Sequence, residues 1–194
     1  LLKEEEKCSL LLKRMYKKKT VLIAPLDWGL GHATRCIPII KSFGAKGAEI
    51  IIAADGRAAR ILKEEFPSLK HLHLRGYRIR YSKTFSMTLM IGLQIPKIIS
   101  AVWREHAELK KIIAEFQPDV VISDSRYGFW NKKAKCILIT HQLMVKCPPV
   151  LKFLEPMIHR IILSFVKKYD ECWVPDVEGK INLSGDLSHK YPLP

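Results

Sequence analysis

Short apolar runs alternate with longer amphipathic segments along most of the chain. The runs are rich in Val, Ile and Leu, and each has the length of a strand that is buried on both faces of a sheet. We therefore expect strands at residues 20–25, 49–54, 70–74, 119–123, 136–140 and 171–175. Apolar residues at helical spacing predict helices at residues 34–46, 56–66, 91–116 and 151–169.

Glycine and proline residues mark the ends of these helices. Gly44 and Gly47 end the first helix, Pro67 ends the second, and Pro118 ends the third. The regular alternation of strands and helices predicts an α/β fold, a Rossmann-like doubly wound parallel sheet with helices on both faces. A chain of 194 residues is long enough for one good-sized domain with its own core.

The N-terminal residues differ from the rest of the chain. Met15 stands where an ordinary start would stand, just before the first expected strand. Residues 1–15 are therefore expected to be an extension ahead of the folded domain, without the long apolar core of a signal peptide. No apolar run in the chain reaches the ~20 residues that a membrane-spanning helix needs.

The turn after the first strand carries the strongest candidate chemistry. It reads Gly29-Leu30-Gly31-His32-Ala33-Thr34-Arg35. A glycine-rich turn between a buried strand and a helix brings bare backbone close to a ligand, and histidine is the side chain best suited to proton transfer near neutral pH. Ligands of open parallel sheets collect at this edge, so the turn is predicted to be an active-site loop.

A dinucleotide site is the nearest competing interpretation of this turn. Gly29 and Gly31 match the first two glycines of the G-x-G-x-x-G fingerprint, but Thr34 stands where the third small residue belongs. Asp55 follows the second strand, roughly where a ribose-binding acid would lie. A nicotinamide or flavin site is therefore an alternative, although its motif is incomplete.

Polar residues also lie at the ends of three later strands, within 123–128, 140–142 and 170–176. Each of them alone is typical of a helix cap. In a parallel sheet, however, all of these strand ends lie at the same edge as His32, and together they predict a cleft.

The chain carries a large positive charge. Its formal net charge is +14, which favours acidic partners such as nucleotide phosphates or an anionic membrane surface. No nucleic-acid-binding motif is present, so nucleic acid is not an expected partner. Five scattered cysteines without a C-x-x-C pair indicate reduced thiols in the cytosol, and no metal-site spacing occurs.

Residues 75–103 begin with basic side chains and continue with apolar ones. This pattern is compatible with a stretch that touches a membrane interface. The alternative is that the apolar residues pack on the sheet or on a further domain.

The turn at residues 29–35 resembles that of the N-terminal domain of GT-B fold glycosyltransferases of the family 28 type. The best-known member of that family is the N-acetylglucosaminyltransferase that forms lipid II. Residues 53–56, 122–128, 139–142 and 171–176 are similar to a bacterial branch of predicted glycosyltransferases, so the resemblance covers about residues 16 to 190. The same G-x-G-H-x-x-R loop also occurs in a related nucleotide-sugar hydrolase of the pseudaminic acid pathway.

The resemblance implies two Rossmann-like domains with the active site between them. Residues 16–175 would be the N-terminal, acceptor-side domain, and residues 176–194 the approach to the linker, with the donor-binding domain absent from this chain. The implied reaction transfers a sugar, with inversion, from a nucleotide-sugar donor, expected to be UDP-linked, to a cell-envelope or lipid-linked acceptor. No metal or other cofactor is implied, and the expected location is the cytoplasm, peripheral to the inner face of the plasma membrane.

The resemblance and the position of the loop together assign expected roles to residues. His32 is the expected general base, and Asp27 is expected to orient it or to act as the base instead. Arg35 is expected either to bind a phosphate or to brace the loop through an ion pair. The remaining residues expected to bind substrate are Gly29, Gly31, Asp124, Arg126, His141 and Gln142.

Two other functions remain open at this point. The nucleotide-sugar hydrolase would use His32 to activate water instead of an acceptor hydroxyl. A non-catalytic basic module would bind an anionic lipid or a protein partner and catalyse nothing.

Overall fold

The computed structural model describes residues 18–76, 87–147, 149–177 and 181–190, and for residues 87–98 it describes the backbone alone. The described chain forms a six-stranded sheet in the order β3-β2-β1-β4-β5-β6 with every pair of neighbours parallel. The strands are β1 (Thr20–Pro25), β2 (Glu49–Ala54), β3 (Lys70–His73), β4 (Val120–Asp124), β5 (Lys135–Ile139) and β6 (Glu171–Trp173). The predicted doubly wound parallel sheet is therefore confirmed.

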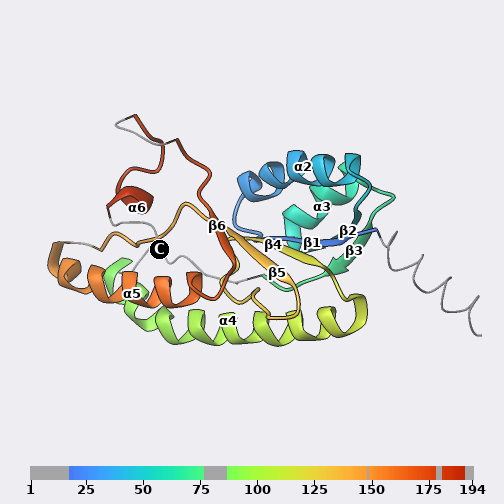
Figure 1. Ribbon diagram of the computed structural model, residues 1–194. Coiled ribbons are helices and arrows are strands. Elements are labelled where there is room, and N and C mark those ends of the chain that lie inside the picture. The colour runs from blue at the N-terminus through green and yellow to red at the C-terminus, as the bar shows by residue number, and fades with distance from the viewer. Residues whose placement is uncertain (1–17, 77–86, 148, 178–180, 191–194) are drawn as a thin grey trace, which may run out of the picture.

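Helices cover both faces of this sheet (Figure 1). Helices α2 and α3 lie on one face, and α4 and α5 lie on the other. Their bounds are α2 (Leu30–Ala45), α3 (Gly56–Glu65), α4 (Met87–Phe116), the 3-10 helix η1 (Pro149–Leu154), α5 (Glu155–Val166) and the short α6 (Asp186–His189).

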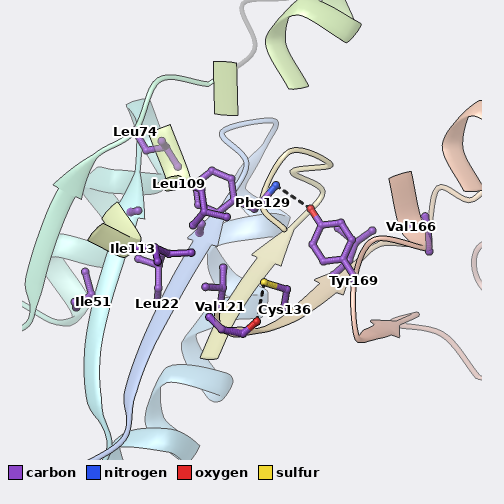
Figure 2. Close-up of a cluster of buried hydrophobic side chains, with 14 of the residues drawn as sticks. Leu22, Ile51, Leu74, Leu109, Ile113, Val121, Phe129, Cys136, Val166 and Tyr169 are labelled. Carbon is purple, nitrogen blue, oxygen red and sulfur yellow. Dashed lines mark hydrogen bonds between the residues drawn. The ribbon is translucent and has the colours of Figure 1, made fainter. Parts of the chain in front are cut away.

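Each face of the sheet has its own hydrophobic core. Residues that alternate along β1 point to opposite faces, so that Leu22 belongs to the core under α4 and α5 while Ile23 belongs to the core under α2 and α3. Figure 2 shows the first of these cores, in which Leu109 and Phe129 pack beside the strands and the Tyr169 hydroxyl accepts a hydrogen bond from the Phe129 N–H. Burial on both faces explains why the central strands are mainly apolar, whereas the edge strands β3 and β6 are only partly buried.

The main difference from the predicted elements lies at the start of the first helix. Helix α2 begins at Leu30 instead of residue 34, so His32 lies in its first turn and not in a loop. Gly29 allows this early start because its φ of 102° is a conformation that L side chains rarely adopt. The prediction that the loop extends to residue 33 is therefore wrong, because the helix begins directly after Gly29.

The last predicted helix is also divided. A single helix was expected at 151–169, whereas the structure has η1 followed directly by α5. Pro156 lies in the first turn of α5, where a missing N–H breaks no intrahelical hydrogen bond. The break therefore coincides with a position that favours proline.

Three predictions fall wholly or partly on residues outside the described ones. They are the extension at residues 1–15, part of the expected linker at 176–194, and residues 77–86 of the basic and apolar stretch at 75–103. Within the part of the chain that the structure describes, no helix is both long enough and apolar enough to cross a membrane.

Helix α4 approaches the loop after β4 very closely at Gly128. A Cβ atom added there would lie 2.2 Å from the carbonyl oxygen of Val102 and 2.6 Å from Cβ of Glu105. The Gly128 N–H also donates a hydrogen bond to the Glu105 carboxylate at 3.3 Å. The absence of a side chain at Gly128 therefore sets the distance between α4 and the sheet.

We predict that Gly128→Ala lowers the free energy of unfolding by about 1–3 kcal/mol, because backbone of α4 must move to admit the methyl group. Urea denaturation measures this loss. Gly44→Ala is the matched control, since a Cβ at Gly44 in α2 would meet nothing within 4 Å and alanine favours a helix. Equal stability of Gly128→Ala and the parent protein would contradict the close packing.

Candidate active site

The candidate site lies where the order of the strands reverses. The chain passes from β1 to β2 and β3 on one side, then returns to place β4 on the other side of β1. The helices that follow β1 and β3 consequently cover opposite faces of the sheet. In open α/β sheets, ligands bind at such a switch point, beside the carboxyl ends of the strands. Asp124 ends β4 beside Pro25, the last residue of β1.

A three-residue cluster fills this position. The Asp124 carboxylate is fully buried and accepts hydrogen bonds from Arg35, from Nε to Oδ2 at 2.8 Å and from Nη2 to Oδ1 at 2.7 Å. Nδ1 of His32 lies 2.9 Å from Oδ1 of the same carboxylate. His32 and Arg35 are three residues apart in α2, so both side chains lie on the same face of the helix. The cluster joins the first turns of α2 to the end of β4.

The contacts of His32 favour a proton on Nδ1 when the ring is neutral. A carboxylate oxygen is only an acceptor, so the contact between Nδ1 and Asp124 is favourable when Nδ1 is protonated. Nη2 of Arg35 also lies 2.9 Å from Nδ1, but Arg35 already donates to both carboxylate oxygens and does not depend on the ring as an acceptor. The Nδ1–H tautomer leaves a lone pair on Nε2, which has no hydrogen-bond partner among the described residues.

Asp27 takes a different position from the one expected. Its Oδ1 accepts a hydrogen bond from the backbone N–H of Ala58 at 3.2 Å, in the first turn of α3. A Cβ added to Gly56 would lie only 1.8 Å from Oδ2 of Asp27, so this carboxylate packs against the start of α3. The carboxylate that contacts His32 is that of Asp124 and not that of Asp27. The alternative role of Asp27, as the base itself, stays a prediction.

His141 joins the same region from the end of β5. Burial of its ring, the positive charge of Arg35 and the charge of His32 lower the pKa of His141, while the carboxylates of Asp124 and Asp176 act in the opposite direction. The parallel pairing of β1, β4, β5 and β6 places the residues at their carboxyl ends along one edge of the sheet. The prediction that polar strand ends share one edge is therefore confirmed.

Arg126 was expected to bind substrate, but its side chain is buried inside the protein. The side chain is fully buried, and its Nη1 donates to Oε1 of Glu105 at 2.7 Å. It also donates to the carbonyl oxygens of Pro25, Leu74 and Arg75. These partners come from α4, from the last residue of β1 and from the chain after β3. Arg126 therefore joins these segments inside the protein and does not face a substrate. A buried arginine needs several acceptors to offset its loss of hydration.

The loop that carries Asp124 and Arg126 is fixed by unusual backbone geometry. Ser125 has a φ of 58°, which turns the chain back under the sheet edge directly after Asp124. Tyr127 then donates its hydroxyl hydrogen to the carbonyl oxygen of Gln142 at 2.7 Å. The backbone of Gln142 thereby connects the loops after β4 and β5, while its side chain is partly exposed.

Gly29 and Gly31 differ in whether the backbone needs a glycine at that position. Gly29 needs its positive φ to start α2, as described above. Gly31 lies inside the first turn of the helix, where a Cβ would meet nothing within 4 Å and where glycine is less favourable than alanine by about 1 kcal/mol. Packing within the described chain therefore does not require a glycine at position 31. The surface beside Gly31 is open.

Asp55, the expected ribose-binding acid of the alternative dinucleotide site, makes hydrogen bonds within the protein. Asp55 caps α3 through the Gly56 N–H and accepts a second hydrogen bond from the Gly76 N–H. Among the residues that the structure describes, no group of three His, Cys, Asp or Glu side chains is arranged to hold a metal ion.

Sequence reasoning selected His32, Arg35 and Asp124 separately but missed how they pair. It also missed Glu105, the partner of Arg126. Glu105 lies between charged residues of α4, but it is spaced three residues after Val102 and four before Leu109, both of which are buried. This helical spacing is the signal that could have marked Glu105 as a buried carboxylate. Such pairs become visible only when elements distant in the sequence are brought together.

We predict that Arg35→Gln raises the pKa of His141, because it removes a positive charge that opposes protonation of that ring. Titration of the imidazole signals by NMR measures the change. Lys41→Gln removes the same charge from an exposed position farther along α2, where Lys41 pairs with Glu65, and should leave the pKa of His141 unchanged. An unaltered pKa in Arg35→Gln would show that the two side chains are not coupled.

Comparison with known proteins agrees with this architecture. In the solved structure of UGT89C1 from Arabidopsis thaliana complexed with UDP, the matched region has a TM-score of 0.52 and 13% identity, and it covers 81% of this chain and 45% of that one. MurG from Acinetobacter baumannii matches with a TM-score of 0.48 and 8% identity over 84% of this chain and 43% of that one. The likeness to UGT89C1 supports the Rossmann-like fold of a GT-B glycosyltransferase domain.

Sequence relatives indicate the same class. An uncharacterized glycosyltransferase of Methanosarcina acetivorans is 26% identical over 175 residues, which cover 86% of this chain and 41% of the relative. This chain thus spans less than half the length of that relative. The sequence model of glycosyl transferase family 1 matches residues 22–143, a range that contains His32, Arg35, Asp124 and His141. The chain therefore belongs to glycosyl transferase family 1.

Proposed function

We propose that the chain forms the acceptor-side part of an inverting glycosyltransferase in which His32 is the general base. The observation that carries this proposal is the hydrogen bond between Nδ1 of His32 and the buried Asp124 carboxylate, which leaves Nε2 available as a proton acceptor. His32 lies at the sheet edge where ligands of open α/β folds bind. Membership of glycosyl transferase family 1 supports sugar transfer as the reaction.

In the proposed reaction, Nε2 of His32 accepts the proton of an acceptor hydroxyl. The hydroxyl oxygen attacks the anomeric carbon of the donor from the face opposite the leaving group, and the new C–O bond forms with inversion. The bond from the anomeric carbon to the diphosphate oxygen breaks, and the nucleoside diphosphate leaves with that electron pair. The His32 imidazolium then returns its proton to solvent.

Asp124 and Arg35 act through His32 in this proposal. The Asp124 carboxylate orients the ring and stabilises the imidazolium that forms during transfer. Arg35 neutralises the same carboxylate before the reaction and so keeps a buried charge from being left unpaired. This arrangement favours bracing of the site over phosphate binding as the main role of Arg35.

We propose a nucleotide sugar, UDP-linked, as the donor. The structure of UGT89C1 contains UDP, and the first turn of α2 offers backbone N–H groups that have no partner within the helix. The open surface beside Gly31 would let a ligand approach this backbone closely. His141 and Gln142 lie toward the acceptor side of the same edge in this proposal.

The proposed acceptor is a lipid-linked or other cell-envelope glycan. This narrower assignment rests on the resemblance of the turn at residues 29–35 to the family that includes the lipid II-forming enzyme. The positive charge of the chain supports an acceptor that carries phosphate groups.

We predict that His32→Ala in the natural full-length protein lowers kcat by ~10²-fold or more, because the acceptor hydroxyl loses its base. The test measures sugar transfer to acceptor and the circular dichroism spectrum of each variant. Lys41→Ala, an exposed change on the same helix, serves as the control and should retain full activity. A folded His32→Ala variant with undiminished turnover would refute the assignment of the base.

Analysis of the products separates transfer from hydrolysis. A transferase should consume the donor slowly without acceptor and should attach the sugar to the acceptor when one is supplied. Rapid release of free sugar without acceptor, lost in His32→Ala, would instead identify the nucleotide-sugar hydrolase. Absence of both activities in the folded parent protein would favour the non-catalytic module.

A further inference from the structure

Asp176, which follows β6, binds a segment of chain that comes after it. Its Oδ1 accepts hydrogen bonds from the N–H groups of Val177 and Leu183 at 2.8 and 2.9 Å. Its Oδ2 accepts one from the Ser184 N–H at 2.8 Å and another from the Ser184 hydroxyl. Nε2 of His189 lies 3.1 Å from the same oxygen. The side chain of Asp176 is only 1% exposed, so these contacts replace its hydration.

These contacts hold the short helix α6 on both sides. Ser184 precedes α6, whereas His189 is its last residue. A helix of four residues is not stable by itself, because helix nucleation is costly. Lys190 adds an ion pair with Glu155 of α5 at 2.6 Å. The position of α6 therefore depends on contacts with the rest of the domain, and Asp176 supplies one on each side of the helix.

Helix α6 in turn holds the loop that carries His141. The carbonyl oxygen of Leu187 accepts hydrogen bonds from the N–H groups of Leu143 and Met144 at 2.9 and 3.1 Å. Leu143 and Met144 are both buried. On the other side of His141, the N–H of Thr140 donates to the carbonyl oxygen of the last residue of β6 at 3.0 Å. Backbone contacts on both sides of His141 consequently fix the course of this loop.

The charge of Asp176 also acts on the His141 ring. Burial of the ring and nearby positive charge lower the pKa of His141, and nearby carboxylates oppose this shift. The charged groups that act on the ring are Arg35, His32, Asp124 and Asp176. Hydrogen bonds, the strongest of them from the Ser184 hydroxyl, hold the pKa of Asp176 below its usual range. Its negative charge therefore persists at neutral pH.

We propose that Asp176 is a positioning residue that acts on the site through α6 and the loop of His141. The inference rests on the proposed function, in which His141 lies toward the acceptor. By holding α6, Asp176 fixes the backbone that carries His141 at the same sheet edge as His32 and Asp124. A displacement of about 1 Å by a change far from the chemistry costs an enzyme up to ~10²-fold in rate. The stretch expected to lead to a linker thereby contributes to the geometry of the site.

Hydrogen exchange and NMR titration of the natural full-length protein test the proposal without reference to activity. In Asp176→Asn, the amides of Leu143 and Met144 should exchange about tenfold faster than in the parent protein, because α6 is held less firmly. The pKa of His141 should fall, because a carboxylate that favours its protonation is lost.

Steady-state kinetics of the same variant test the consequence for the substrate. Asp176→Asn should raise the KM for the acceptor about tenfold and change kcat less, because His141 is displaced while the pair of His32 and Asp124 is retained.

Asp170→Asn is the matched control. Asp170 accepts a hydrogen bond from the Cys136 N–H at 2.7 Å, near the amino ends of β5 and β6 and thus at the sheet edge opposite the site. This variant loses the same charge and should leave the exchange of both amides, the pKa of His141 and the KM unchanged. His189→Ala removes only the contact at the end of α6, from a side chain that is 33% exposed. It should accelerate the exchange by less than Asp176→Asn does.

Three results would overturn the proposal. They are unchanged exchange at Leu143 and Met144 in folded Asp176→Asn, an equal effect of Asp170→Asn, and faster exchange with an unaltered KM for the acceptor. If Asp176→Asn does not fold, exchange in His189→Ala decides in its place. Failure of the proposed function has a different signature, a parent protein without transferase activity, and exchange then still tests the link from Asp176 to the loop.

Discussion

The candidate site depends on one buried charge, the carboxylate of Asp124. Removing a carboxylate from water costs several kcal/mol unless charged and hydrogen-bonding partners surround it. Arg35 supplies two hydrogen bonds in a planar fork, and His32 supplies a third contact. Because both partners come from the first turns of α2, satisfying this charge fixes how α2 begins relative to the end of β4. The requirement that positions the helix also orients the proposed base.

A second buried charged residue, Arg126, stabilises the loop that carries Asp124. Arg126 follows Asp124 by two residues and is paired with Glu105 of α4, while Tyr169 donates its hydroxyl hydrogen to the carbonyl oxygen of Arg126. Gly128 allows α4 to approach closely enough for this pairing. The loop after β4 therefore has little freedom to move, which keeps the Asp124 carboxylate in place. Preorganisation of this kind is what a proton-transfer site requires.

The fold could be predicted from the sequence because it depends on local patterns. Continuous apolar runs such as 20–25 are typical of strands buried on both faces, and Pro67 and Pro118 mark where helices must end. The start of α2 could not be placed, because a glycine with positive φ can either extend a loop or begin a helix at once. The His32 and Arg35 part of the site could also be predicted, because a histidine and an arginine in a glycine-rich turn indicate an active-site loop. The pairings of Asp124 with Arg35 and of Arg126 with Glu105 depend on contacts between residues far apart in the sequence, which no local pattern specifies.

The protonation state of His32 tests the central claim most directly. Nitrogen-15 NMR of the imidazole distinguishes a protonated ring nitrogen from one that carries a lone pair. The structure predicts that neutral His32 carries its proton on Nδ1, facing Asp124, with the lone pair on Nε2. A neutral ring protonated on Nε2 would contradict the account, because the nitrogen that faces the substrate side could then donate a proton but not accept one.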